Sequence, residues 1–213
     1  MTARVAVLLA VLSMFLHLRA HYRGPRWQVY LFKPLTTGLL LVAALLAIRA
    51  HGQWYAIAVA TGLACSLVGD VLLMLPGDRF TAGLGAFLLA HLAYLAAFTA
   101  LAPVGNGPIL LPPLVVAAGV LLRTIWAGLG RRRVPVLAYT FVVVLMVWTA
   151  WGWRVRAPAA GASLAATGAT RFMISDTILA LNRFRQPFRS AQALIMSTYV
   201  AAQAMISLSV GIA

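Results

Sequence analysis

Long apolar stretches, each separated from the next by a few polar residues, recur from one end of the sequence to the other. None has the strict alternation of apolar and polar positions that marks a strand of a membrane barrel. An α-helix needs about 20 residues to cross the hydrocarbon core of a bilayer, and most of the stretches reach that length. The pattern therefore predicts eight membrane-spanning helices, at residues 3–18, 29–48, 54–75, 80–101, 108–129, 134–151, 157–181 and 190–212.

The gaps between these stretches are short. Residues 76–79 (PGDR) and 102–107 (APVGNG) have the composition of turns, and no gap is long enough to separate two domains. Short connections favour antiparallel neighbours. We expect an all-α integral membrane protein, with a single bundle of about eight transmembrane helices and one polytopic membrane domain over residues 1–213.

Composition strengthens the membrane assignment. The chain is 63% hydrophobic and 9% charged, whereas soluble domains are about 25% charged. Its 17 basic and 3 acidic residues give a net charge of +14. The arginines lie between the apolar stretches rather than in a basic domain, so we expect membrane lipids and no nucleic acid as partners. With one cysteine, no glutamate, and no P-loop, CxxC or HExxH motif, we expect no metal and no other cofactor.

The arginines also predict an orientation. If every stretch crosses the membrane, ten arginines fall on one side, at positions 19, 23, 26, 79, 131, 132, 133, 183, 185 and 189. Four fall on the other side, at positions 4, 49, 154 and 156. The positive-inside rule then places the arginine-rich loops in the cytoplasm and both termini outside. We expect a multi-pass protein of a bacterial inner membrane.

Several ionisable residues interrupt the apolar stretches. A charge at the bilayer centre costs at least about 2.5–3.5 kcal/mol, so each such residue is a functional candidate. They are Lys33, Asp70, His91, Arg123, Arg171 and Asp176. Lys33, Asp70, Tyr139 and Asp176 each lie one or two turns from the arginine-rich end of their helix. Because helices far apart in sequence share this depth, we expect a common cavity there.

Helical spacing adds polar neighbours to these residues. Lys33 and Thr37 share one stripe, as do Tyr199 and Gln203, while Asn182 lies about 120° around its helix from Asp176. The candidate catalytic residues are Asp70, Asp176, Lys33 and His91. The candidate substrate-binding residues are Tyr94, Tyr139, Asn182, Tyr199 and Gln203.

The same residues also have purely structural explanations. Asp70 with Lys33, and Asp176 with Arg171, are candidates for buried ion pairs that fix helix register. His91 suits a packing hydrogen bond, and Asp78 falls in a turn where water solvates it. Two intramembrane aspartates are also a feature of intramembrane aspartyl proteases, which carry YD and GxGD motifs. Here only the GD of GxGD is present, and Asp176 follows Ser rather than Tyr.

Five short stretches resemble a known family. They are residues 33–36 (KPLT), 66–73 (SLVGDVLL), 90–94 (AHLAY), 174–184 (ISDTILALNRF) and 198–203 (TYVAAQ). Together they resemble the YhhN-like family of eight-helix membrane proteins, which includes the animal lysoplasmalogenases. The motif SD-x5-N followed by Y-x3-Q is the most specific part.

The resemblance implies hydrolysis of the vinyl ether bond of a lysoplasmalogen, or a related lysophospholipid or ether lipid, to a fatty aldehyde and a glycerophospho-alcohol. Vinyl ether hydrolysis needs an acid that protonates carbon and a group that activates water, and two carboxyls divide such work in glycosidases. Asp70 and Asp176 suit these roles, with either assignment open. Two alternatives remain: a proton-coupled transporter of a small solute, and a non-catalytic lipid-binding protein.

Overall fold

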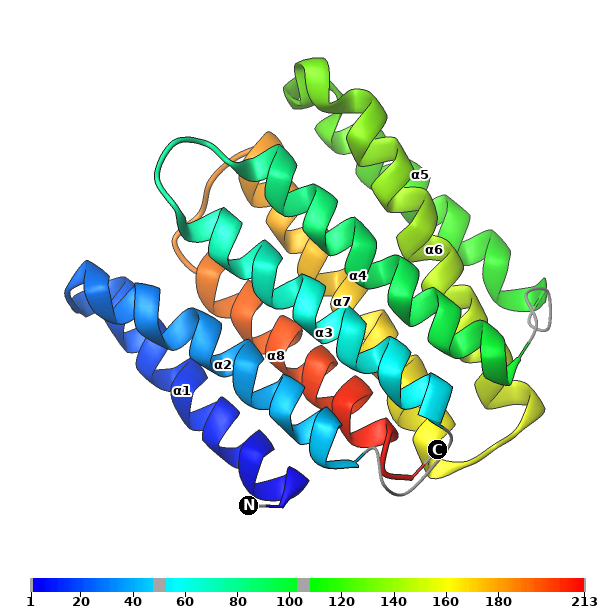
Figure 1. The fold of residues 1–213 in the computed structure, drawn as a ribbon. Helices are drawn as coiled ribbons and strands as arrows, with labels where there is room; N and C mark the ends of the chain where they lie inside the picture. Colours follow the sequence, from blue (N-terminus) through cyan, green and yellow to red (C-terminus); the bar gives the residue numbers. More distant parts are fainter. Residues whose placement is uncertain (1, 48–52, 103–107, 213) are drawn as a thin grey trace.

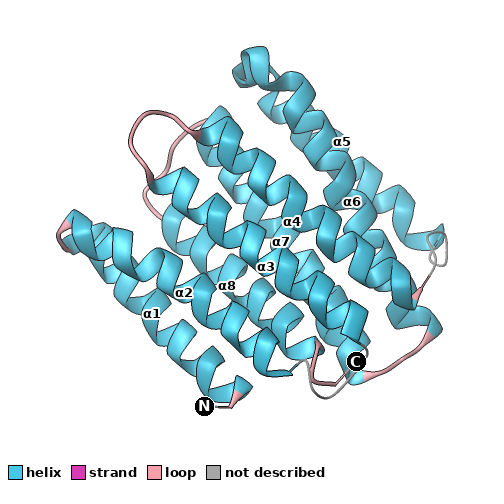
Figure 2. Ribbon diagram, viewed as in Figure 1, coloured by secondary structure: helices cyan, strands magenta, loops and turns pink. Residues whose placement is uncertain are grey.

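The computed structural model describes residues 2–47, 53–102 and 108–212. These residues form eight α-helices and no strand (Figure 2), which confirms the predicted all-helical fold. The predicted turn at 103–107, Arg49 and the predicted helix end at residue 48 lie outside the described residues. The helices are α1 (Ala3–Arg23), α2 (Arg26–Ala47), α3 (Gln53–Met74), α4 (Phe80–Leu101), α5 (Leu111–Leu129), α6 (Arg133–Arg156), α7 (Ala160–Phe184) and α8 (Ala191–Ser209).

The helices extend beyond the apolar stretches that predicted them. α1 continues past residue 18 to Arg23, and α6 continues past residue 151 to Arg156. Hydrophobicity marks only the part of a helix that lies in hydrocarbon, whereas backbone hydrogen bonding continues into the head-group region. Long arginine side chains reach water from there while their methylene stems stay in apolar surroundings.

Six helical segments are long and apolar enough to cross a membrane. One of them, Leu111–Arg156, has 46 residues because a 3-10 turn (Gly130–Arg132) joins α5 directly to α6. Two crossings need about 40 residues. The chain reverses at Gly130, whose φ of 50° a side chain would strain, and α5 packs back against α6. α7 is rich in Gly, Ala, Ser and Thr and is not among the six segments.

The helices are arranged so that the start of α1 and the end of α8 lie at one end of the bundle (Figure 1). The α1–α2, α3–α4, α5–α6 and α7–α8 turns, which carry most of the arginines, lie at the other end. We call this the arginine-rich end. α8 packs against α1, α2 and α7, while α4 packs against α3 and α6.

Small residues let the helices approach closely. A Cβ at Gly168 on α7 would lie 3.0 Å from the Ala202 carbonyl oxygen on α8. Small side chains are the usual means by which membrane helices gain packing contacts. Large apolar side chains such as Phe15, Val116 and Phe141 are exposed on the outside of the bundle, where lipid would cover them.

Asp78 ties the arginine-rich end together. It lies in the turn between α3 and α4, and its carboxylate accepts hydrogen bonds from Arg132 (2.7 Å) and Arg183 (2.5 Å). The carboxylate is therefore ion-paired as well as exposed to solvent. It links the α3–α4 turn to the start of α6 and the end of α7.

Candidate active site

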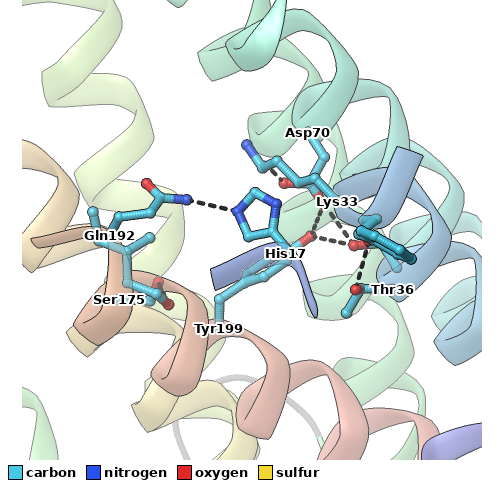
Figure 3. Close-up of polar contacts among 10 residues, drawn as sticks. His17, Lys33, Thr36, Asp70, Ser175, Gln192 and Tyr199 are labelled. Carbon is cyan, nitrogen blue, oxygen red and sulfur yellow. Dashed lines mark hydrogen bonds and ion pairs between the residues drawn. The ribbon is translucent and has the colours of Figure 1, made fainter. Parts of the chain in front are cut away.

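Asp70 on α3 is the centre of a buried polar cluster (Figure 3). Its Oδ2 accepts hydrogen bonds from the Thr37 hydroxyl at 2.6 Å and the Tyr199 hydroxyl at 2.8 Å. Its Oδ1 lies 3.5 Å from Nζ of Lys33. The side chain of Asp70 is only 4% exposed and that of Lys33 12%. Two hydroxyl donors and an amine are the partners expected for an ionised carboxylate, which can only accept hydrogen bonds.

Local sequence explains why α2 supplies two of these partners. Lys33 and Thr37 are four residues apart, so both side chains face α3 from the same stripe. This agrees with the helical spacing in the sequence, and it realises the Asp70–Lys33 ion pair considered there.

Asp176 on α7 is the centre of a second polar cluster. Its Oδ2 accepts a hydrogen bond from the Tyr139 hydroxyl at 2.9 Å and lies 3.4 Å from Nε2 of His91. The imidazole is fully buried, whereas the carboxyl is 17% exposed. The alternative of an ion pair with Arg171 is not observed among the described residues, and the Arg171 side chain is exposed.

The hydrogen bonds of His91 fix the position of one proton. Nδ1 lies 2.6 Å from the backbone carbonyl oxygen of Phe87, which can only accept, so Nδ1 carries a hydrogen. In a neutral ring, Nε2 would then present a lone pair to a carboxylate oxygen. Nε2 makes no hydrogen bond among the described residues, so a proton shared with Asp176 would give this buried nitrogen a partner.

Aromatic rings connect the two clusters. The Phe172 ring centroid lies 4.5 Å from that of His91 and 5.3 Å from that of Tyr199. Phe87 contacts both Phe172 and Tyr199, at centroid distances of 6.3 and 6.0 Å. The two carboxyls thus belong to separate hydrogen-bond clusters that share an apolar wall.

Deeper in the bundle, Tyr94 donates a hydrogen bond to Oε1 of Gln203 at 2.6 Å, and both side chains are fully buried. Nε2 of Gln203 and Oγ of Ser66 are buried without a hydrogen-bond partner among the described residues. Polar atoms in this state commonly hold an internal water. This third cluster lies one turn along α8 from Tyr199.

The remaining candidates lie elsewhere. Asn182 accepts a hydrogen bond from the backbone N–H of Phe188 at 3.1 Å, which places it in the α7–α8 turn. Its amide belongs to neither carboxyl cluster. Arg123 is exposed on α5.

Two cavities open beside the carboxyl clusters. One is apolar, has a volume of about 140 Å³, and lies among α4, α5, α6 and α7, with Asp176 and Tyr139 in its wall. The other has a volume of about 470 Å³, lies among α1, α2, α3 and α8, and reaches Lys33. Leu73 lines both cavities. We call them the apolar crevice and the polar cavity.

The polar cavity contains residues that the sequence analysis missed, namely His17, His21, Arg26 and Gln192. His17 and His21 are four residues apart on α1, and this spacing was the available signal. His17 lies inside the first predicted stretch but was not counted among its ionisable residues, and His21 lies beyond the end of that stretch at residue 18.

The chain is similar to known proteins over most of its length. The family model described as "YhhN family" matches residues 28–210. The membrane protein YhhN of Escherichia coli O6:H1 is 36% identical over 198 residues, covering 92% of this chain and 93% of its own.

Animal proteins are also similar. Lysoplasmalogenase TMEM86B of Sus scrofa is 39% identical over 190 residues, covering 87% of this chain and 76% of its own. Lysoplasmalogenase TMEM86B of Homo sapiens is 36% identical over 184 residues, covering 86% and 75%. No solved structure matches the chain. The family match and these relatives, which extend over most of the sequence, show that the chain belongs to the YhhN family.

Proposed function

We propose that this protein hydrolyses the vinyl ether bond of a lysoplasmalogen or a closely related lysolipid, with release of a fatty aldehyde and a glycerophospho-alcohol. The observation that carries the proposal is the approach of His91 Nε2 to the Asp176 carboxyl, which lies in the wall of an apolar crevice. The lysoplasmalogenases among the relatives support the same chemistry.

The reaction requires protonation of carbon. A proton adds to the vinyl carbon farther from the ether oxygen, and the adjacent carbon becomes part of an oxocarbenium ion. Water attacks that carbon and loses a proton, which gives a hemiacetal. The hemiacetal then collapses to the aldehyde and the free glycerol hydroxyl. The acid that gave the first proton is restored by the proton that water loses.

Asp176 is the acid in this proposal. Its carboxyl lines the crevice, whereas His91 behind it is fully buried and would share the proton without touching substrate. After proton transfer the carboxylate would face the oxocarbenium ion, stabilise its charge and accept the proton from attacking water. One carboxyl acts as acid and then as base in the same way in retaining glycosidases.

Asp70 is assigned the role of the ionised carboxylate in this proposal. Lys33, Thr37 and Tyr199 each present a hydrogen to it. Its negative charge would lower the energy of the cationic intermediate. It also holds Lys33 at the inner end of the polar cavity. Asp70 and Asp176 therefore receive different roles, which the sequence alone left open.

The substrate would lie with its hydrocarbon chain in the apolar crevice. The crevice wall is formed by side chains such as Leu121, Ile125, Val143 and Met173, so it offers the chain an apolar surface that water would otherwise cover. The head group would then point to the arginine-rich end. In keeping with the positive-inside rule, this end would face the cytoplasm of a bacterial cell and the protein would lie in the inner membrane.

The test is to incubate purified protein with a panel of lysolipids and to identify the products by mass spectrometry. We expect a fatty aldehyde from the vinyl ether lysolipid and none from its saturated ether analogue. Aldehyde release must depend on Asp176, and its loss in Asp176→Asn is the internal control. Proton flux driven by a solute in liposomes, without aldehyde release, would instead identify a carrier.

A further inference from the structure

The polar cavity between α1, α2, α3 and α8 has a composition suited to an anion. Its wall contains Arg26, Lys33, His17 and His21, and its described wall contains no carboxylate. Lys33 is the only lysine of the chain and lies at the inner end, where Asp70 fixes its amine. Arg26 stands near the start of α2, at the mouth. Two cationic side chains and two imidazole rings therefore line the cavity.

Hydrogen-bond donors in the cavity are also left open. The Gln192 amide nitrogen lies 3.1 Å from Nε2 of His17 (Figure 3). The amide N–H donates, so Nε2 of His17 accepts and Nδ1 carries the ring hydrogen. His17 is fully buried, and its Nδ1 makes no hydrogen bond of ordinary geometry among the described residues, apart from a poorer backbone contact with Val29. A buried donor without a partner costs free energy, which a bound acceptor would recover.

Position supplies the third argument. Leu73 lies in the wall of both cavities, so the inner end of the polar cavity approaches the apolar crevice. A lysophospholipid has its phosphate on one side of a glycerol backbone and its chain on the other. A lysophospholipid that spans Leu73 would place its phosphate in the polar cavity and its chain in the apolar crevice, with the vinyl ether between the two.

We infer that the polar cavity binds the phosphate of the lysolipid head group through Lys33, Arg26 and the donor face of His17. This inference rests on the proposed function for the identity of the lipid, but its recognition chemistry does not require turnover. Charge-assisted hydrogen bonds to phosphate oxygens are among the strongest available to a protein.

Binding of unreactive probes tests the inference. Three probes are compared on purified protein in detergent by calorimetry: a saturated 1-O-alkyl lysophospholipid, the same alkylglycerol without phosphate, and glycerol 3-phosphate. We expect the lysophospholipid to bind at least about tenfold more tightly than the alkylglycerol, because one charge-assisted contact is worth at least that factor. Glycerol 3-phosphate should compete with the lysophospholipid, which separates a head-group site from general binding to the detergent micelle.

Arg26→Gln should reduce the preference for the phosphate, and Arg26→Gln with His21→Gln, which removes both exposed basic side chains of the cavity wall, should reduce it further. Both side chains are exposed, so these variants keep the core intact. Arg26→Lys should retain the preference. Arg19→Gln is the matched control, because Arg19 is exposed near the same end of α1 and does not line the cavity.

Two outcomes overturn the inference: equal affinity for the lipid with and without phosphate, or an unchanged preference in the double variant. Aldehyde release by a protein that shows no phosphate preference would leave the proposed function standing and remove this site. A phosphate preference without any aldehyde release would leave this site standing and remove the proposed function.

Discussion

Nε2 of His91 lies 3.4 Å from Oδ2 of Asp176, while Nδ1 of the same ring is 2.6 Å from the Phe87 carbonyl oxygen. The bond to Phe87 uses the only N–H hydrogen of a neutral ring, so Nε2 then faces the Asp176 carboxyl with a lone pair. A residue that served packing alone would need only the backbone bond. The orientation of Nε2 toward a carboxyl in the crevice wall suits His91 to a positioning role in the proposed proton transfer.

Asp176→Asn should abolish aldehyde release, lowering kcat by at least about 100-fold, the usual contribution of a positioned acid. The amide keeps the shape of the carboxyl but cannot supply the proton. Affinity for the saturated ether analogue should stay near the wild-type value. Turnover and binding are measured on the same preparation.

Asp70→Asn should also lower turnover, but by a different route. Loss of the carboxylate leaves the Lys33 amine without its partner, so affinity for the phosphate-bearing probe should change along with kcat. Asp78→Asn is the matched control, because Asp78 pairs with Arg132 and Arg183 at the surface and should leave turnover unchanged. Full activity in either buried-aspartate variant contradicts the assignment.

Protonation at carbon makes an isotopic prediction. When the reaction runs in D₂O, the released aldehyde should carry one deuterium on the carbon next to the carbonyl, because the acid of the site exchanges with solvent before it transfers its proton. Mass spectrometry measures the label. Authentic aldehyde incubated in the same buffer corrects for exchange after release. An unlabelled product would exclude the proton-transfer step assigned to Asp176.

The sequence predicted the helices well because hydrocarbon allows few alternatives to a continuous helix. Residues 80–101 coincide with α4, and the polar residues of α2, α3, α6 and α7 share a depth that the structure reproduces in the Lys33–Asp70 and Tyr139–Asp176 contacts. Depth follows from counting residues along a helix. It needs no knowledge of which helices are neighbours.

The sequence could not predict which side chains pair, because pairing depends on which helices are neighbours. Arg171 and Ser175 share a helical face near Asp176, yet the described partners of Asp176 are Tyr139 and His91 from other helices. The rotation of each helix and the order of packing decide this, and both depend on contacts such as Phe87 with Phe172. Likewise, nothing in the spacing of Asn182 indicated its bond to the α7–α8 turn.

Tyr139→Phe should lower kcat more than it lowers substrate affinity. The ring remains in place against His91, at a centroid distance of 5.1 Å, but the hydroxyl that donates to Asp176 is lost. A hydrogen bond to the carboxylate that forms when Asp176 gives up its proton is worth about 1.5–3 kcal/mol, so the expected fall is about tenfold or more. Kinetics with the vinyl ether lysolipid measure it.

Tyr55→Phe is the control for this change. Tyr55 is also buried and hydrogen-bonded through its hydroxyl, to Ser209 at 2.6 Å, but it lies near the start of α3, at the opposite end of that helix from Asp70. This variant should lose stability without a specific effect on kcat. A similar kcat for the two variants would remove Tyr139 from the site.

Filling the apolar crevice should change the preference for chain length. Ala118→Phe adds a ring inside the crevice, so KM for long-chain lysolipids should rise more than KM for short-chain ones. Val116→Phe places the same ring on the same helix at a position that is 64% exposed and outside the crevice, so it serves as the control. If both variants keep the wild-type preference, the chain binds elsewhere.

Gly62 should be intolerant of even a methyl group, and this tests the packing beneath the site. A Cβ at residue 62 would lie 2.3 Å from Cε1 of Tyr94, whose ring cannot swing away because its hydroxyl is bonded to Gln203. Gly62→Ala should therefore destabilise the protein by about 1–3 kcal/mol, the usual cost of overpacking. At Gly85 on α4 a Cβ would meet nothing within 4 Å, so Gly85→Ala should unfold in detergent at the wild-type temperature or above it. Equal melting temperatures for the two variants would mean that Tyr94 and Gln203 are not locked together as described.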